Sequence, residues 1–367
     1  MIWLCIFFVP HLGTAWAYSS FDADVPEEEI AINPNEINQA IFPNGEDPFD
    51  TPWQMDLDEP VIIEESVGAK PKGSEGRIRL NIGSGIKKSQ IKTFQNKTQK
   101  NPNDYKAHYN LGVVYAGVGN YNAAVEPLQE AIRLQPNEPA PYNYLGLVYS
   151  SLRMFPEAID YSNKALQLEP TMLEPKINLV NVYEKIGMLK EMVEPLQAIT
   201  KKLPFDPHYF SLLGWVHYQL GNPQEAVQPL QEAIRLGSEK SRDQRYLGEV
   251  FLALEQYQWA INPLKKAVKM TPNLPGPLYN LGTAYANVNQ CAEAIPFLKK
   301  SLELNPEFAE AYGNLGACYH KQGRQTEALA HYKKALELDP ELVELQKNIH
   351  TLQNDPLATV GLEPPGQ

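Results

Sequence analysis

Cysteine is scarce in this 367-residue sequence, and Lys and Arg are missing from its first 65 positions. Three cysteines exclude a disulfide-built scaffold and any cysteine-rich zinc module. The motifs His-Glu-x-x-His and Gly-x-Ser-x-Gly are absent, and so is a phosphate-binding glycine loop. The net charge of −12 disfavours sequence-independent binding to nucleic acid, which depends on Lys and Arg neutralising phosphates.

The charge that is present is concentrated near the N-terminus. Residues 1–65 carry 14 acidic side chains, and residues 66–100 carry nine basic side chains against the single acid Glu75. The acidic block is rich in Pro, Asn and Gly and shows no helical or strand period. We expect residues 18–86 to form a disordered arm, first acidic and then basic. Within it, residues 77–86 alternate weakly, so a short strand there stays open.

Residues 1–17 resemble a secretory signal peptide. An apolar run from Ile2 to Val9 is followed by Ala15-Trp16-Ala17, which fits the small-x-small cleavage pattern. The run lacks a preceding Lys or Arg and is too short to span a bilayer. We expect export to the periplasm or the exterior after cleavage near Ala17, and a cytoplasmic protein with an apolar N-terminus is the alternative. No later stretch has membrane length, so no transmembrane span is predicted.

The rest of the chain is dominated by a 34-residue period. A Leu-Gly pair recurs at this spacing, with one degenerate copy at Leu179-Val180. Seven units follow, opening at Tyr105, Pro139, Leu173, Pro207, Ser241, Pro275 and Ala309. An aromatic residue or histidine comes three positions after each Gly or its equivalent: Tyr115, Tyr149, Tyr183, His217, Phe251, Tyr285 and Tyr319. Apolar residues at spacings of three and four predict two amphipathic helices per unit, separated at glycines such as Gly119.

Small residues recur where two helices must approach closely, as at Gly112 and Ala124. One helix pair cannot bury its apolar faces alone, so successive pairs are expected to stack. Five units place a proline inside the second helix: Pro127, Pro195, Pro229, Pro263 and Pro296. An interior proline removes a backbone hydrogen bond, and we expect a local bend at each.

Over residues 105–342 the pattern resembles the tetratricopeptide repeat family, as in bacterial solenoids of this type and in the repeat region of O-GlcNAc transferase. The resemblance implies an all-α fold, a right-handed superhelical solenoid of seven units. Residues 87–104 and 343–354 are expected to be the N-terminal and C-terminal capping helices, and residues 355–367 a flexible tail.

The resemblance also implies that the first helices line a groove that binds protein or peptide. The residue before each Leu-Gly pair then faces the groove: Asn110, Tyr144, Asn178, Leu212, Tyr246, Asn280 and Asn314. The four asparagines are similar to the asparagine ladder of O-GlcNAc transferase, although asparagine is common at this position of the repeat. The carboxylate clamp for chaperone tails is not matched, because Tyr109 and Val113 stand where Lys and Asn are needed.

The middle of the expected groove is its most distinctive part. Leu212, Trp215 and Tyr218 share one helical face, and Arg245 and Tyr246 belong to the next unit. Trp, Tyr and Arg dominate binding hot spots, so a peptide contact is predicted here, with Trp215 as a core residue the alternative.

Dispersed histidines argue against a metal site, and no cofactor is predicted. His217 is interpreted as a core substitute for the recurring tyrosine, and Cys291 and Cys318 as free thiols. We therefore expect a non-catalytic scaffold or assembly factor with a protein or peptide partner, and self-association stays open. The alternatives are an adaptor autoinhibited by its own acidic arm and a non-catalytic subunit of an envelope enzyme complex.

Overall fold

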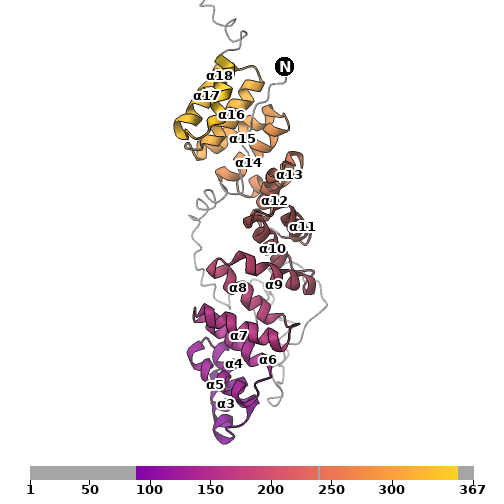
Figure 1. The fold of residues 1–367 in the computed structure, drawn as a ribbon, viewed down its shortest axis with the longest axis vertical. Helices are drawn as coiled ribbons and strands as arrows, with labels where there is room; N and C mark the ends of the chain where they lie inside the picture. The colour runs from indigo at the N-terminus through magenta and orange to yellow at the C-terminus, as the bar shows by residue number, and fades with distance from the viewer. Residues whose placement is uncertain (1–87, 239, 354–367) are drawn as a thin grey trace, which may run out of the picture. The chain divides into compact units, whose positions relative to one another are not determined.

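The computed structural model describes residues 88–238 and 240–353, whose helices are shown in Figure 1. Sixteen α-helices and their connecting turns account for these residues, without a strand among them. The all-α fold expected from the repeat is confirmed. The signal-like segment 1–17, the arm 18–86 and the tail 355–367 lie outside the described residues. None of the described helices combines the length and the apolarity that crossing a bilayer requires.

Each unit folds into two helices joined by a short turn. The first helices are α4 (Tyr105–Gly117), α6 (Pro139–Ser151), α8 (Glu174–Ile186), α10 (Pro207–Gln219), α12 (Ser241–Ala253), α14 (Pro275–Asn287) and α16 (Ala309–Lys321). The second helices are α5 (Tyr121–Leu134), α7 (Phe155–Leu168), α9 (Leu189–Lys202), α11 (Pro223–Arg235), α13 (Tyr257–Met270), α15 (Cys291–Leu304) and α17 (Gln325–Leu338). Helix α3 (Lys88–Lys100) packs on α4, and α18 (Val343–Gln353) packs on α17, at the two places where capping helices are expected.

The turn between the two helices has the same backbone conformation in all seven units. The fifteenth residue of each has a positive φ: Gly119, Arg153, Gly187, Gly221, Glu255, Asn289 and Gly323. The next residue then bonds back across the helix end, as Asn120 N does to the carbonyl of Tyr115 at 2.9 Å. Glycine adopts this conformation without steric cost, which explains why it occupies four of the seven positions.

The glycine of each Leu-Gly pair marks the closest approach of the two helices. A Cβ added at Gly112 would lie 2.4 Å from Cγ of Leu128, and one at Gly282 would lie 2.7 Å from Cγ of Leu298. Leu128 and Leu298 are fully buried, as is Ala124 beside the first pair. The close approach predicted from these small residues is confirmed.

The five predicted prolines lie inside second helices of the structure, at Pro127, Pro195, Pro229, Pro263 and Pro296. Pro127 is the seventh residue of α5. Because proline has no backbone N–H, it cannot donate the helical hydrogen bond to the carbonyl four residues earlier. The bend expected at these positions stays a prediction.

The chain divides into two compact units, whose boundary falls inside α8 between Val182 and Tyr183. In the N-terminal unit, described from residue 88 to 182, the core includes the fully buried Leu128, Leu145 and Val148. In the C-terminal unit, described over 183–238 and 240–353, one core cluster runs from Tyr218 to Leu352, and Leu196 and Val216 are also fully buried. The predicted groove positions are therefore divided, with Asn110, Tyr144 and Asn178 in the first unit and the others in the second.

A buried carboxylate fixes the start of α12. Asp243 is fully buried and accepts hydrogen bonds from the hydroxyls of Ser211, at 2.6 Å, and Ser238. Ser238 stands where six of the seven units end with proline, so this unit exchanges a helix-stopping ring for a hydrogen-bond donor. The exposed Arg242 approaches the same carboxylate at 3.9 Å.

Candidate functional site

Contacts between successive first helices define one side of the C-terminal unit. Helix α10 contacts α12, α12 contacts α14, and α14 contacts α16, although a second helix follows each of them in the chain. We call this side the inner face. The side chains that the sequence singles out on α10, α12 and α14 lie here.

Two tyrosines and an arginine form an aromatic and cationic group on the inner face. The rings of Tyr218 and Tyr246 lie with centroids 5.6 Å apart and planes inclined by 36°. The Arg245 guanidinium carbon lies 4.8 Å from the centroid of the Tyr246 ring, a cation–π geometry. The structure therefore brings together three residues that the sequence placed in the middle of the groove.

Glu249 connects this group to the next first helix. Its Oε1 accepts a hydrogen bond from Nδ2 of Asn280 at 2.9 Å and lies 3.7 Å from Nη1 of Arg245. The Tyr218 hydroxyl also donates to it, and burial followed by the Glu249 charge raises the pKa of Tyr218 far above its ordinary value. Glu249 was not predicted from the sequence. The available signal was its position four residues after Arg245, which places the two side chains on one helix face where they can form an ion pair. We call Tyr218, Arg245, Tyr246, Glu249 and Asn280 the α10–α14 cluster.

Trp215 lies on the face of α10 that carries Tyr218, and its side chain is half-buried. Part of the indole ring is therefore accessible to a ligand. Leu212, three residues earlier, is 5% exposed and offers little area to a ligand. Trp215 is thus the aromatic side chain of α10 that is both accessible and next to the α10–α14 cluster.

The predicted asparagine ladder makes contacts between repeats. Nδ2 of Asn178 donates to Oδ1 of Asn143 at 2.8 Å, and Nδ2 of Asn314 donates to the Thr283 hydroxyl at 2.8 Å. Together with Asn280, three of the four asparagines direct an N–H at the preceding first helix. Their amide donors therefore hold neighbouring repeats together, and a role in peptide binding stays a prediction.

The N-terminal unit places its predicted groove residues in an aromatic setting. Tyr144 is 6% exposed and lies edge-on to Tyr109, with ring centroids 5.6 Å apart. Burial raises the pKa of Tyr109 well above its ordinary value, and its hydroxyl donates to Tyr144. The Oδ1 atoms of Asn110 and Asn178 are buried without a hydrogen-bond partner, which leaves two acceptors on this unit.

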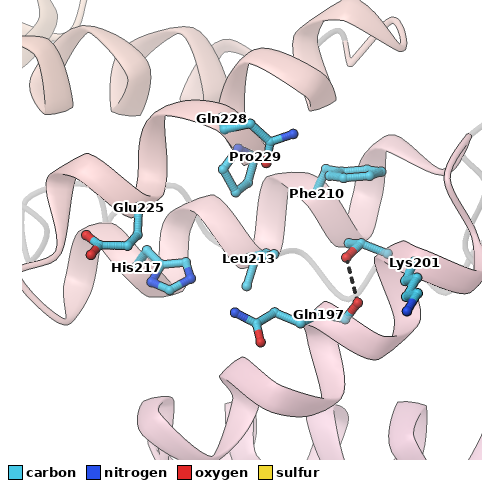
Figure 2. A pocket seen from close by; sticks show the side chains of 9 residues that line it. Gln197, Lys201, Phe210, Leu213, His217, Glu225, Gln228 and Pro229 are labelled. Atoms are coloured by element: carbon cyan, nitrogen blue, oxygen red, sulfur yellow. Dashed lines mark hydrogen bonds between the residues drawn. The ribbon is translucent and has the colours of Figure 1, made fainter.

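A hollow of about 500 Å³ opens on the other side of α10. Figure 2 shows the side chains around it, which come from α9, α10 and α11 of the C-terminal unit. It is lined by Gln197, Thr200, Lys201, Phe210, Leu213, His217, Glu225, Gln228 and Pro229. His217, interpreted from the sequence as a core substitute for tyrosine, is indeed buried, but it borders this hollow.

Groups of three or more His, Cys, Asp or Glu side chains with metal-binding geometry are not found among the described residues. His331 stacks on the Tyr319 ring at a centroid distance of 5.3 Å. Cys291 and Cys318 are buried thiols that do not form a disulfide, as expected. A hydrogen bond with Cys318 lowers the pKa of the Cys291 thiol, so the two sulfurs are neighbours although they occupy different repeat positions.

Family models described as tetratricopeptide repeat match residues 105–138 and 309–342, residues 196–241 and 211–275, and residues 276–308. The matches cover parts of both units, including α10, α12 and α14. The search of curated proteins found no significant match.

Solved structures with similar helical repeats include MamA from Desulfovibrio magneticus RS-1, 24% identical, which covers 46% of this chain and 96% of its own at a TM-score of 0.42. YrrB, described as a TPR protein with an unusual peptide-binding site, is 23% identical. The match covers 61% of this chain and 97% of YrrB at a TM-score of 0.32. A tetratricopeptide repeat protein from Parabacteroides merdae is 17% identical. The match covers 68% of this chain and 99% of that protein at a TM-score of 0.40.

Proposed function

This chain is a tetratricopeptide repeat protein, and from that premise we propose that it is a non-catalytic interaction scaffold that binds a peptide segment of a partner protein on its inner face. The binding centre is Trp215 together with the α10–α14 cluster. Proteins of this fold can serve unrelated functions, so the proposal depends on the side chains and not on the fold.

The observation that carries the proposal is the position of half-buried Trp215 beside a preorganised cluster. Tyr218, Arg245 and Glu249 are fixed by one another, so binding a ligand there costs little side-chain entropy. A tryptophan that keeps accessible surface next to such a cluster offers apolar contact, and the partly exposed guanidinium of Arg245 offers charge.

The test uses peptides selected on the full chain from a random display library, with affinities measured by fluorescence anisotropy. Trp215→Ala is expected to weaken the selected peptides at least tenfold, which corresponds to about 1.4 kcal/mol. Trp259→Ala is the matched control, because Trp259 is 70% exposed on the second helix α13. Loss of affinity in the control with full binding by Trp215→Ala would overturn the proposed site.

The acidic segment 18–65 is the alternative occupant of the inner face that the sequence suggests, and it lies outside the described residues. Its 14 acids and scattered apolar residues are the features that would suit Arg245 and Trp215. An autoinhibited adaptor predicts that deleting residues 18–65 strengthens binding of the selected peptides. Unchanged or weaker binding by the deletion variant excludes it.

Export is proposed on the residue pattern of segment 1–17. A place in an extracytoplasmic assembly, including that of a non-catalytic subunit of an envelope enzyme complex, depends on it. N-terminal sequencing of the protein purified from its native host tests the cleavage. A mature start near Tyr18 supports export, and an intact Met1 contradicts it.

A further inference from the structure

A stacked aromatic pair fills the space between the two helices of three units. The ring at position 11 of the unit stacks on the ring at position 23, twelve residues later. Tyr149 stacks on Tyr161 with centroids 5.3 Å apart, Tyr285 on Phe297 at 5.9 Å, and Tyr319 on His331 at 5.3 Å. The planes in these pairs are within 20° of parallel.

The second helix of the preceding unit reaches the same position-11 ring. Gln95 donates to the Tyr115 hydroxyl at 2.8 Å, and Gln129 donates to the Tyr149 hydroxyl at 3.4 Å. In later units a lysine takes this role, with Lys265 Nζ 5.4 Å from the centroid of the Tyr285 ring. The position-11 ring is thus held from both sides.

In the fourth unit this arrangement is reduced to one small ring. Position 11 is His217, which is shorter than tyrosine, and position 23 is Pro229, which has no aromatic ring. The other units with proline at position 23 have a larger, six-membered aromatic ring at position 11: Tyr115, Tyr183 and Phe251. The hollow of about 500 Å³ lies at this unit, which combines the smaller imidazole at position 11 with proline at position 23. Its volume falls within the range of about 300–1,000 Å³ typical of ligand sites.

A buried polar atom of His217 borders this hollow without a partner. The side chain is 8% exposed, and its Nδ1 makes no hydrogen bond. Figure 2 shows the ring between the Glu225 carboxylate and the Gln197 amide, with Leu213 beside it. Burial lowers the pKa of His217, so the imidazole is neutral near pH 7 and Nδ1 either donates or accepts, according to its tautomer.

A phenol hydroxyl suits this atom better than an indole or a phenyl ring does. It donates and accepts, and so satisfies either tautomer, whereas an indole only donates and a phenyl ring does neither. Phe210, Leu213 and Pro229 supply an apolar lining for the ring. The exposed Lys201, Glu225 and Gln228 leave the mouth open to a polypeptide backbone.

We propose that this hollow binds a tyrosine side chain of a partner polypeptide, whose ring supplies the missing aromatic filling and whose hydroxyl bonds to Nδ1 of His217. Trp215 is two residues from both Leu213 and His217, which turns it about 200° around the helix from each. The tyrosine site therefore lies on the opposite side of α10 from the inner face, and it goes beyond the function proposed above.

The test titrates N-acetyl-L-tyrosinamide against the full chain labelled with ¹³C and ¹⁵N in histidine. The ring signals of His217 are expected to shift saturably, while those of His320 and His350 stay in place. Saturation-transfer NMR on the probe gives the affinity. N-acetyl-L-phenylalaninamide, which lacks only the hydroxyl, is expected to bind about fivefold more weakly.

His217→Tyr is the decisive variant, because tyrosine stands at this position in five of the other six units and fills the hollow from within. This variant is expected not to bind N-acetyl-L-tyrosinamide, while its helical content stays that of the parent. Trp215→Ala on the inner face is expected to bind the probe as the parent does, so this proposal and the peptide site can fail separately. Unmoved His217 signals, equal affinities for the two probes, or full binding by His217→Tyr would each overturn the tyrosine site.

Discussion

The rings of Tyr149 and Tyr161 stack with centroids 5.3 Å apart and planes inclined by 20°, and they close at the second unit the space that stays open at the fourth. Gln129 holds Tyr149 from the preceding unit, and its counterpart before the fourth unit is Gln197. The open space is therefore a local substitution within a regular packing scheme, which makes it repairable by mutation.

His217→Tyr is expected to stabilise the chain by about 1 kcal/mol, since the larger ring buries apolar area that the hollow now exposes. Its hydroxyl also comes within reach of Gln197, as that of Tyr149 does of Gln129. Urea unfolding followed by circular dichroism measures the shift in midpoint. His217→Phe is the control, because it fills the space without the hydroxyl. An unchanged or lower midpoint for both variants would contradict this account of the hollow.

A pair of glycines in α14 separates helix propensity from close packing. At Gly282 a Cβ would lie 2.7 Å from Cγ and 2.8 Å from Cδ2 of Leu298, whereas at Gly276 nothing lies within 4 Å. Gly282→Ala is expected to destabilise the chain by about 1–3 kcal/mol through overpacking. Gly276→Ala in the same helix should change the stability by less than about 1 kcal/mol, because alanine favours the helix but a Cβ before Pro277 opposes the helical conformation. Equal effects in urea unfolding would show that the approach of α14 and α15 does not require glycine.

The sequence predicted the features that each repeat carries in its own residues. The helix pairs, the break at Gly119 and the tight approach at Gly112 follow from the 34-residue period, because each depends on the residue types at one or two neighbouring positions. Glu249 and the hollow were not predicted, since each depends on side chains that meet only in the folded protein. The hollow requires His217 and Pro229 together. From the sequence alone, His217 is interpreted as a core residue and Pro229 as the site of a bend.

The direction of the asparagine side chains could not be predicted either. An asparagine before the Leu-Gly pair donates either to a bound peptide or to the preceding helix, and the residue type is the same in both cases. The structure gives Asn314 the hydroxyl of Thr283 as an acceptor and gives Asn280 the carboxylate of Glu249. These acceptors differ from one unit to the next, so the repeat period carries no signal for them.

Asp243→Asn is expected to destabilise the C-terminal unit by about 2 kcal/mol. The buried carboxylate accepts from Ser211 and Ser238, and charge-assisted hydrogen bonds are the strong ones. An amide replaces one acceptor oxygen by a donor that faces the same hydroxyls. Arg242→Ala is the matched control, because the exposed Arg242 guanidinium lies 3.9 Å from the buried carboxylate, beyond hydrogen-bond distance, and should contribute less than about 1 kcal/mol. Thermal unfolding compares the two, and a larger loss in Arg242→Ala would contradict the assignment.

The stability of the protein is expected to fall as the pH decreases from about 7, in part because of His331. Burial and the Lys299 charge lower the pKa of this side chain below its ordinary value, against the opposing influence of Glu327. The unfolded chain therefore binds a proton at a higher pH than the folded chain does. Between the two pKa values the unfolded state holds more protons, so acidification favours unfolding, and the loss levels off below the folded pKa.

His331→Phe isolates this contribution, because Phe297 occupies the same position in the preceding unit and stacks on Tyr285. The stacking with Tyr319 is kept and the titrating group is removed. Urea midpoints at pH 7.5 and pH 5.0 are expected to differ less in the variant than in the parent. His350→Phe serves as the comparison, because it makes the same replacement in another helix, α18. The same pH dependence in parent and His331→Phe would mean that His331 titrates alike in the folded and unfolded chains, and that its burial against Tyr319 and Lys299 does not oppose protonation.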